Sequence, residues 1–403
     1  MSTHAKKLQI AILLPTIISK NGTAKQSLEL AKILQSHGHL VSFFTYAYLK
    51  TSSFPEFKNF LVYSCVNIEK SLVYKIIKNV SSLETIYLYL ALLFIKRFRN
   101  LFNGKNITIY NPHDWMGLWV VTGLKNSKTI VANINDVPQR NSGFINRLKL
   151  IRDRKYKNKI DHIVVLDNSN KRKATEWLNI SSQKISVIRS GIDLGKYKKF
   201  NKKYDIKKDL HLTKKDSLLV CANLLAPNRR YEDVLSVMAK FKKKGIILHV
   251  LILAKLDFNP SYAELLKKII REDHLEEQVH FIDKFFSDEE RMLYIQNSDV
   301  LIFPNSPQTW GLTVIEAMAL GVPVIVSSGS GVSEVLQDNI NAYVYKGENR
   351  KELSAKIDQY LQHTSESKKI AARGREYVLK TFSWEKFGGE IEELMLQDMQ
   401  IKK

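Results

Sequence analysis

The chain has few cysteines, a shortage of acidic residues and no apolar run of transmembrane length. Its two cysteines, Cys65 and Cys221, lie far apart and show no metal-ligand spacing, which argues against a disulfide framework and against a zinc site. This cysteine usage indicates a reducing compartment. With 403 residues, of which 44% are hydrophobic and 10% aromatic, the chain is long enough for two globular domains with separate cores.

The longest apolar run lies within residues 84–99 and has about ten members, whereas a transmembrane helix needs about 20. We predict a buried domain helix there, and the alternative is a helix on a membrane surface with basic residues at its end. A second run, residues 10–18, follows two lysines in the manner of a secretion signal. Because it contains Pro15, lacks a cleavage site of small residues and leads into an amphipathic helix, we predict that it forms the first buried strand.

Acidic residues number 40 against 62 Lys and Arg, which gives a formal net charge of +22 and a pI near 9.6. Such an excess attracts anionic surfaces, polyphosphates or nucleic acid. Two markedly basic segments are residues 147–159 and 196–208. For these segments two interpretations stay open, a peripheral contact with anionic lipid head groups and ordinary solvated helix faces. Binding of nucleic acid is the weaker alternative, because no recognisable binding motif or aromatic and basic platform accompanies the charge.

Two stretches have the strand, loop and helix pattern that opens a doubly wound parallel sheet. The first is residues 8–46, which also include a turn and a second strand, and the second is residues 217–241. A lysine-rich stretch at residues 195–215 lies before the second pattern and is the expected domain boundary. Residues 51–105 are hard to place, because their mixture of aromatic residues and lysines has no clear period. The sequence therefore predicts an α/β protein of two domains.

The most informative stretch, residues 303–336, reads as a strand, a loop, a short helix, a second strand and a glycine-rich turn. Its helix opens on Gly311, so the backbone N–H groups of Leu312 and Thr313 and the positive end of the helix dipole face the loop. Such a helix end suits an anion, most simply a phosphate. Glu316 lies about one turn into the helix, where its carboxylate can accept hydrogen bonds from sugar hydroxyls. The alternative is an ordinary strand–helix–strand unit in which Glu316 is solvated.

The residues IEAMALGVPVIVSSGSGVSEV within this stretch resemble the donor-binding segment of the retaining glycosyltransferases of family 4. The family pattern is a Glu, seven residues, a second Glu followed by Ala-Met-Ala, then Gly-x-Pro-Val and a glycine-rich turn ending in Glu-Val. Glu316 takes the place of the second Glu, and Gln308 replaces the first. The resemblance implies the GT-B architecture, an α/β fold with two Rossmann-like doubly wound domains facing a central cleft.

The resemblance covers nearly the whole chain and implies a division into four parts. An N-terminal acceptor-binding domain is expected over residues 1–194 and a linker over residues 195–216. A C-terminal domain that binds the nucleotide sugar is expected over residues 217–380. The last part, residues 381–403, resembles the closing helix of the family, which returns to the first domain.

The resemblance also implies roles for residues outside the central stretch. The family keeps a His near the reacting sugar at the carboxyl end of a strand, and His113 occupies that place here. The glycine-rich loop after the first strand is reduced to Gly22. Where the family often has another His, this chain has Asn135 and Asp136, so no second His is carried over.

In the second domain, the family holds the donor diphosphate with Gly-Arg, five residues, then Lys. Here Asn223 stands at the Arg position and Arg229 at the Lys position, and Arg230 offers a second, shifted charge. A guanidinium can bind phosphate through two hydrogen bonds. Losing an Arg at Asn223 and a Glu at Gln308 leaves the charge balance around a diphosphate unchanged. We take this as the hypothesis that the site is a coherent variant.

The implied function is the transfer of a hexose, of the mannose or glucose type, from a nucleoside diphosphate sugar to a glycan or lipid-linked saccharide acceptor. Arg229, Arg230 and the helix mouth would bind the diphosphate, Glu316 the ribose, Gln308 the donor sugar, and His113 the sugar near its reacting carbon. Since the cations replace a metal, neither a metal nor a cofactor is expected. A non-catalytic partner subunit and a nucleotide-sugar epimerase are the alternatives. We expect a cytoplasmic enzyme, with the membrane surface as a candidate place of work.

Overall fold

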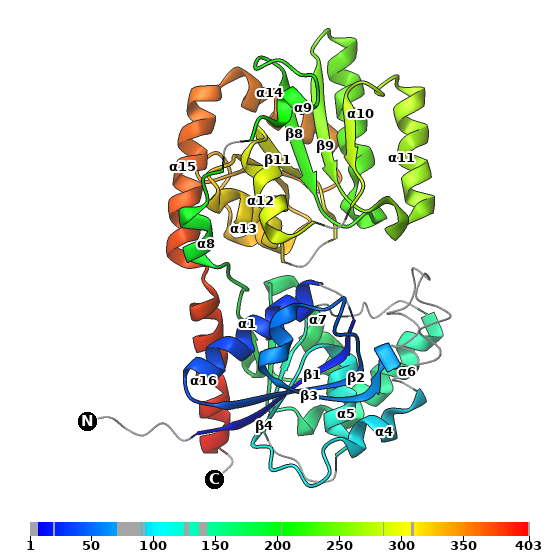
Figure 1. The fold of residues 1–403 in the computed structure, drawn as a ribbon, viewed down its shortest axis with the longest axis vertical. Coiled ribbons are helices and arrows are strands. Elements are labelled where there is room, and N and C mark those ends of the chain that lie inside the picture. The colour runs from blue at the N-terminus through cyan, green and yellow to red at the C-terminus, as the bar shows by residue number, and fades with distance from the viewer. Residues whose placement is uncertain are drawn as a thin grey trace, which may run out of the picture. The chain divides into compact units, whose positions relative to one another are not determined.

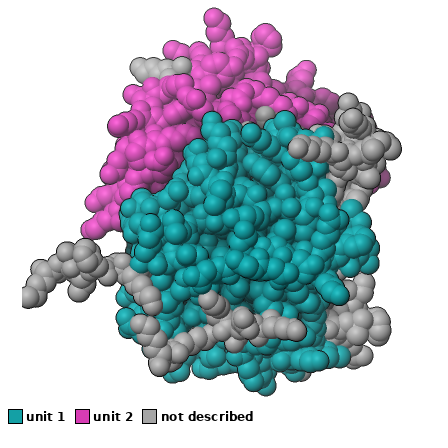
Figure 2. All heavy atoms as spheres, turned by 60° about the horizontal axis from the view of Figure 1, so that its bottom comes forward, with its two compact units in different colours: residues 1–190, 384–403 teal, residues 191–383 magenta. Residues whose placement is uncertain are grey.

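The computed structural model describes residues 7–18, 21–70, 90, 93–124, 129–135, 137, 143–202, 204–284, 286–307 and 310–401. Gln308, Asp136 and most of the run at residues 84–99 therefore lie outside the described residues. The chain divides into two compact units (Figures 1 and 2). Unit 1 comprises residues 1–190 and 384–403, and unit 2 comprises residues 191–383.

Unit 1 is built on a parallel sheet with seven strands in its described part, in the order β3-β2-β1-β4-β5-β6-β7. The strands are β1 (Gln9–Ile17), β2 (Leu40–Tyr48), β3 (Leu61–Asn67), β4 (Ile109–Pro112), β5 (Thr129–Asn133), β6 (His162–Val165) and β7 (Ile185–Val187). The N-terminal apolar run is β1, and all but its first residue are buried, so the prediction of a strand there is confirmed.

The helices described in unit 1 are α1 (Gly22–Ser36), α4 (Ile95–Asn100), α5 (Asp114–Thr122), α6 (Gly143–Tyr156), α7 (Asn168–Leu178) and α16 (Trp384–Ile401). The side chain of Asn21 caps α1 by accepting from the N–H of Ala24 at 2.8 Å. The C-terminal helix α16 lies beside α1 (Figure 1), where Gly388 allows a close approach to Ile33. The described end of the apolar run is mixed, since Phe98 is fully buried while Leu93 is 75% exposed.

Unit 2 has a parallel sheet with six strands in its described part, in the order β10-β9-β8-β11-β12-β13. These are β8 (Ser217–Ala222), β9 (Leu248–Leu253), β10 (Val279–Ile282), β11 (Val300–Phe303), β12 (Val324–Ser327) and β13 (Tyr343–Tyr345). Its helices are α8 (Leu194–Lys199), α9 (Ile206–Asp209), α10 (Tyr231–Lys243), α11 (Pro260–Glu272), α12 (Asp288–Gln296), α13 (Leu312–Ala319), α14 (Arg350–Gln362) and α15 (Thr364–Thr381).

Both sheets have buried central strands because helices cover their two faces, which explains why these strands read as continuous apolar runs. Every residue of β9, β11 and β12 is buried. In unit 2 the strand order reverses between β8 and β11, and in unit 1 between β1 and β4. Ligands of open parallel sheets bind at the carboxyl ends of the strands beside such a reversal. The loops that follow β8 and β11 are therefore the first place to look for a site in unit 2.

No helix within the described part of the chain combines the length and the apolar character that crossing a bilayer demands.

Candidate functional site

The loops after β8 and β11 are joined by hydrogen bonds at the carboxyl edge of the unit 2 sheet. The loop after β8 contains a short 3-10 turn, Pro227–Arg229. The N–H of Ser306 donates to the carbonyl of Asn228 at 3.0 Å, and the side-chain amide of Asn228 donates to the carbonyl of Pro307 at 3.2 Å. These bonds hold the turn that carries Arg229 against the loop that leads into α13.

Arg229 is a partly buried cation with two buried donor atoms that have no partner among the described residues. Its Nε and Nη1 atoms are inaccessible to solvent, and neither has a hydrogen-bond partner among the described residues. Burial lowers the pKa of its guanidinium, as expected for a charge that has lost water. Because an unpaired buried charge is costly, the arrangement is suited to an anion that arrives from outside the chain.

Arg230 is placed differently from its neighbour. Its backbone is in the left-handed region, with φ of 52°. Its Nε donates to Oδ2 of Asp233 at 2.6 Å, and its Nη1 lies 3.6 Å from the carboxylate of Glu348. The hydrogen bond to Asp233 raises the pKa of Arg230. Since Arg350 also donates to Asp233, the three side chains form one network, and the charge of Arg230 is already paired.

Helix α13 presents its N-terminus to the same region. Gly311 is its N-cap residue, and no side chain caps the first turn, which begins with Leu312 and Thr313. A Cβ atom on Gly311 would lie 2.9 Å from Val332 and 3.1 Å from the ring of Phe303, so a side chain there would force a shift of the packing. The helix end is thus free of a side-chain cap and is suited to an anion.

Asn305 is a polar residue that the sequence analysis did not single out. It lies two positions after the end of β11 and is fully buried, and neither atom of its side-chain amide has a partner within the described residues. A buried amide without partners is uncommon and marks a position that a bound group can complete. The signal in the sequence is an Asn that ends an apolar strand at the carboxyl edge. Asn223, by contrast, is partly exposed, and its backbone carbonyl accepts from the hydroxyl of Tyr231 at 3.1 Å.

Glu316 is only 8% exposed, so the alternative of a solvated helix residue is wrong. Its Oε1 accepts from Nη2 of Arg291 at 2.8 Å. The carboxylate raises the pKa of the Arg291 guanidinium. Gln308, the other residue predicted to bind the donor, lies outside the described residues, so its side chain is not placed.

In unit 1, His113 ends β4 and precedes α5. It is fully buried, and its Nε2 lies 3.0 Å from Oδ1 of Asn111 and 3.1 Å from Nδ2 of Asn133. The amide of Asn111 donates to the carbonyl of Val131 at 2.6 Å, which turns its Oδ1 toward the imidazole. Nε2 thus faces an acceptor, Oδ1 of Asn111, and a donor, Nδ2 of Asn133, so the two contacts call for opposite protonation of this nitrogen.

The other ring nitrogen of His113, Nδ1, is buried and has no partner among the described residues. Burial lowers the pKa of His113 to about 3, so the ring is neutral at physiological pH. Gly22 opens α1, where an added Cβ would meet open space, and Thr23 beside it accepts from the amide of Asn135 at 3.1 Å.

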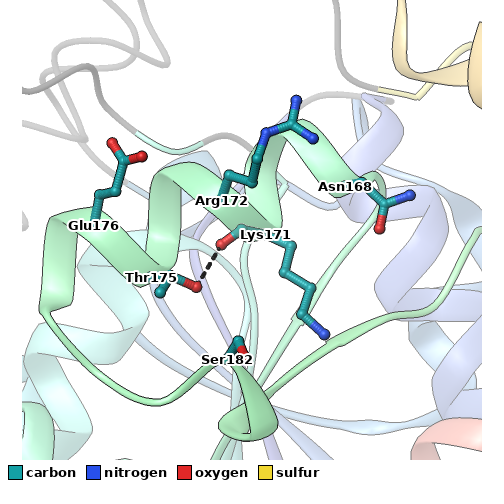
Figure 3. Close-up of a pocket in the computed structure, with 6 residues that line it drawn as sticks. All are labelled: Asn168, Lys171, Arg172, Thr175, Glu176 and Ser182. Carbon is teal, nitrogen blue, oxygen red and sulfur yellow. Dashed lines mark hydrogen bonds between the residues drawn. The ribbon is translucent and has the colours of Figure 1, made fainter.

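The described residues offer no metal site, and their open groove lies away from the predicted site residues. Within the described ranges, no group of three or more His, Cys, Asp and Glu side chains could hold a metal ion. An open groove beside α7 contains none of the predicted site residues (Figure 3). It is lined by Asn168, Lys171, Arg172, Thr175, Glu176 and Ser182.

Known proteins resemble the chain along nearly its whole length. The family model described as Glycosyltransferase Family 4 matches residues 20–196, and the model described as Glycosyl transferases group 1 matches residues 202–377. The uncharacterized glycosyltransferase MJ1607 of Methanocaldococcus jannaschii is 21% identical over 293 residues, which cover 70% of this chain and 73% of that protein.

A second relative is N,N'-diacetylbacillosaminyl-diphospho-undecaprenol alpha-1,3-N-acetylgalactosaminyltransferase of Campylobacter jejuni. It is 27% identical over 212 residues, and the match spans 51% of this chain and 52% of that protein. Among solved structures, HepE of Anabaena in complex with UDP and glucose has a TM-score of 0.76 at 14% identity, with 97% of this chain and 100% of that chain covered. Because the two family models match successive halves of the chain and the fold agrees, the chain belongs to glycosyltransferase family 4, the retaining group 1 enzymes of the GT-B fold that use nucleotide-sugar donors.

Proposed function

We propose that this glycosyltransferase binds a nucleoside diphosphate hexose, of the glucose or mannose type, at the carboxyl edge of the unit 2 sheet and transfers the sugar to a lipid-linked saccharide. The observation that carries the proposal is the guanidinium of Arg229, in which two buried donor atoms, Nε and Nη1, have no acceptor among the described residues. The donor diphosphate supplies the missing anion. In the transition state, the leaving diphosphate gains negative charge, and preorganised donors stabilise it.

The other residues of unit 2 have complementary roles in this proposal. The N-terminus of α13, at Gly311, Leu312 and Thr313, binds a phosphate oxygen through backbone N–H groups. Arg230 is held in place by Asp233 and contributes a second cation beside the diphosphate bound by Arg229. Asn223 lies on the same loop as Arg229 and replaces a cation of the family. Gln308, which replaces an anion, binds the donor sugar. Glu316 accepts hydrogen bonds from the ribose hydroxyls.

In unit 1 we assign a sugar contact to His113. Nδ1 of its neutral ring has no partner among the described residues, and a sugar hydroxyl near the reacting carbon, which can donate or accept, is a suitable partner. Gly22, which opens α1 with open space in front of it, leaves room for the substrate at the same edge of this sheet. No protein nucleophile is part of this proposal, since the demand on the chain is to orient the sugar and stabilise the leaving group.

The choice of a lipid-linked acceptor is supported by charge. Unit 1 holds 32 of the 62 Lys and Arg but only 15 of the 40 Asp and Glu, so it carries +17 of the net charge of +22. The exposed Leu93 and Phe94 precede the basic residues of α4. Basic and apolar groups together suit the surface of an anionic membrane. The Campylobacter relative is named for a diphospho-undecaprenol substrate, which is such an acceptor.

The proposal is tested by incubating the protein and a diphospho-undecaprenol-linked saccharide with UDP-glucose, UDP-N-acetylglucosamine, GDP-mannose or ADP-glucose. Binding of each donor is measured by calorimetry, and turnover is measured as release of the nucleoside diphosphate. We expect release from one donor, and a loss of about 100-fold in Arg229→Met. Arg373→Met is the matched control, because Arg373 is exposed and pairs with Glu366 at 2.9 Å. Binding without any turnover would favour the non-catalytic partner subunit, and no binding of any donor would overturn the proposal.

The hypothesis of a coherent variant has its own test. Asn223→Arg and Gln308→Glu restore the family residues one at a time, and each shifts the charge of the site by one unit. We expect each single variant to be less active than the wild type. If either variant were the active form and the wild type inactive, the site would be a decayed one.

A further inference from the structure

Four side chains from three helices meet at the Glu316 carboxylate. Arg291 of α12 donates to Glu316 at 2.8 Å and lies 3.3 Å from Asp288 of the same helix. Tyr197 of α8, a helix that packs against α13, is close enough to Glu316 and Arg291 to interact electrostatically with both. Figure 1 shows that α8, α12 and α13 are close neighbours within unit 2.

Tyr197 and Glu316 are the buried members of this cluster, whereas the side chains of Arg291 and Asp288 are 29% and 37% exposed. Tyr197 is 4% exposed, and burial, together with the carboxylate of Glu316, raises its pKa well above the ordinary value. The Nε of Arg291 is buried and has no partner among the described residues. An ion pair with one partly exposed member adds little to the stability of a fold. A purely structural role therefore explains the cluster poorly, whereas a role in orienting Glu316 explains why it is charged.

The position of α8 in the chain adds a second reason. The chain enters unit 2 at Gly191, and the N–H of Ile192 donates to the carbonyl of Phe382, close to the point where the chain leaves unit 2. Asp193 then caps α8 by accepting from the N–H of Lys196 at 3.0 Å. Lys196 also lies 3.7 Å from Asp288. The segment that enters unit 2 is thus tied to α12 and, through Tyr197, to Glu316.

We propose that Arg291 and Tyr197 are positioning residues for the donor, which hold the Glu316 carboxylate in the orientation that accepts the ribose hydroxyls. The inference rests on the proposed role of Glu316. Arg291 occupies one carboxylate oxygen and neutralises the charge, while Tyr197 fixes the same group from the side of α8. Remaining lone pairs of the carboxylate serve the ribose, since a carboxylate accepts up to about four hydrogen bonds.

The test compares ribose and deoxyribose nucleotides. UDP, GDP and their 2'-deoxy and 3'-deoxy forms are titrated calorimetrically into the wild type and into Glu316→Gln, Tyr197→Phe and Arg291→Lys, after thermal melting has shown that each variant is folded. Tyr360→Phe is the matched control for Tyr197→Phe. It removes a tyrosine hydroxyl that donates to the carbonyl of Asp299 at 3.0 Å instead of facing Glu316.

In the wild type, we expect the ribonucleotide that binds to bind about ten times or more tightly than one of its deoxy forms, since hydrogen bonds to a charged group are the strong ones. In Tyr197→Phe and Arg291→Lys this ratio falls toward one, as in Glu316→Gln, while Tyr360→Phe keeps the wild-type ratio. A stability role alone would lower the melting temperature and leave the ratio intact.

The two proposals fail in different ways. If no nucleotide binds the wild type, or if it binds ribose and deoxyribose forms equally well, the donor role of Glu316 is wrong. If Glu316→Gln loses the ratio but Tyr197→Phe and Arg291→Lys retain it, Glu316 binds ribose and the positioning role is overturned.

Discussion

At the scale of single residues, Arg229 and Arg230 show how neighbours in the sequence acquire different chemistry. Arg230 is saturated by Asp233, three positions later, whereas Arg229 points two donor atoms into a buried region with no acceptor among the described residues. The pairing of Arg230 is a local contact that sequence spacing could have predicted. The isolation of Arg229 depends on the loop after β11, about 75 positions away, and only the fold reveals it.

His113 gives a prediction at the same scale. Its pKa of about 3 in the folded chain lies below the ordinary 6.5, so the unfolded chain takes up a proton first as the pH falls. Its neutral state therefore contributes stability fully above pH 6.5 and loses that contribution as the pH falls toward 3. When the pH falls from 7 to 5, the wild type should lose about 2 kcal/mol of unfolding free energy because of His113. His113→Gln should lack this part of the loss.

Urea unfolding of unit 1 at the two pH values, followed by Trp fluorescence, measures this difference. His211→Gln, a change of an exposed histidine in unit 2, is the control and should follow the wild type. Equal losses in the wild type and in His113→Gln would show that His113 is not held neutral by burial.

At the scale of elements, local signals in the sequence placed the central helix well. The short helix expected after Gly311 is observed as α13, Leu312–Ala319, with Gly321 at a φ of 79° just beyond it. Ser287 caps α12, and the Glu290 side chain returns the hydrogen bond. These features depend on residues within four or five positions, which is why they are readable.

Other elements were beyond such reasoning. Residues 51–105 showed no clear period, yet they contain the edge strand β3, whose side chains are mostly half-buried. An edge strand with one neighbour lacks the continuous apolar run of a central one. Likewise, nothing local connects Glu316 with Arg291, 25 positions earlier, or with Tyr197, because those contacts arise from helix packing.

Helix α16 provides a prediction at this scale. Both ring nitrogens of His37 face its carboxylates, Nδ1 at 2.5 Å from Glu392 and Nε2 at 3.0 Å from Glu385. His39 adds a bond of 2.7 Å to Glu392. The hydrogen bond to Glu392 is the main reason why the pKa of His37 is raised. The contribution of protonated His37 to docking is therefore complete below pH 6.5 and is lost as the pH rises through the higher, folded value.

Hydrogen exchange of the α16 amides, corrected for the intrinsic pH dependence, measures this docking. We expect protection to fall between pH 6 and pH 9 in the wild type and to change less in His37→Gln. Glu393→Gln is the control on the same helix, because Glu393 accepts from Gln397 rather than from a histidine. A wild-type protection that is flat across this range would refute the role of His37.

At the scale of the whole molecule, the two units divide the chemistry of the chain. The charge of unit 2 is nearly balanced, with 30 basic and 25 acidic residues. This unit holds Arg229 with its two buried donor atoms, the N-terminus of α13, and Glu316. Unit 1 carries most of the positive charge and the neutral His113. Each unit is a series of alternating strands and helices around a parallel sheet, and this alternation is visible in the sequence. The strand patterns and the family resemblance could therefore predict the fold.

The account depends most directly on a diphosphate site at Arg229. Titration of UDP and UMP, and of GDP and GMP, into the wild type and Arg229→Met tests it, because the diphosphates add one phosphate and leave the nucleoside unchanged. The account predicts that the wild type binds one diphosphate at least about ten times more tightly than its monophosphate, and that Arg229→Met loses most of this preference while Arg373→Met keeps it. An unchanged preference in Arg229→Met, or no preference in the wild type, would contradict the account.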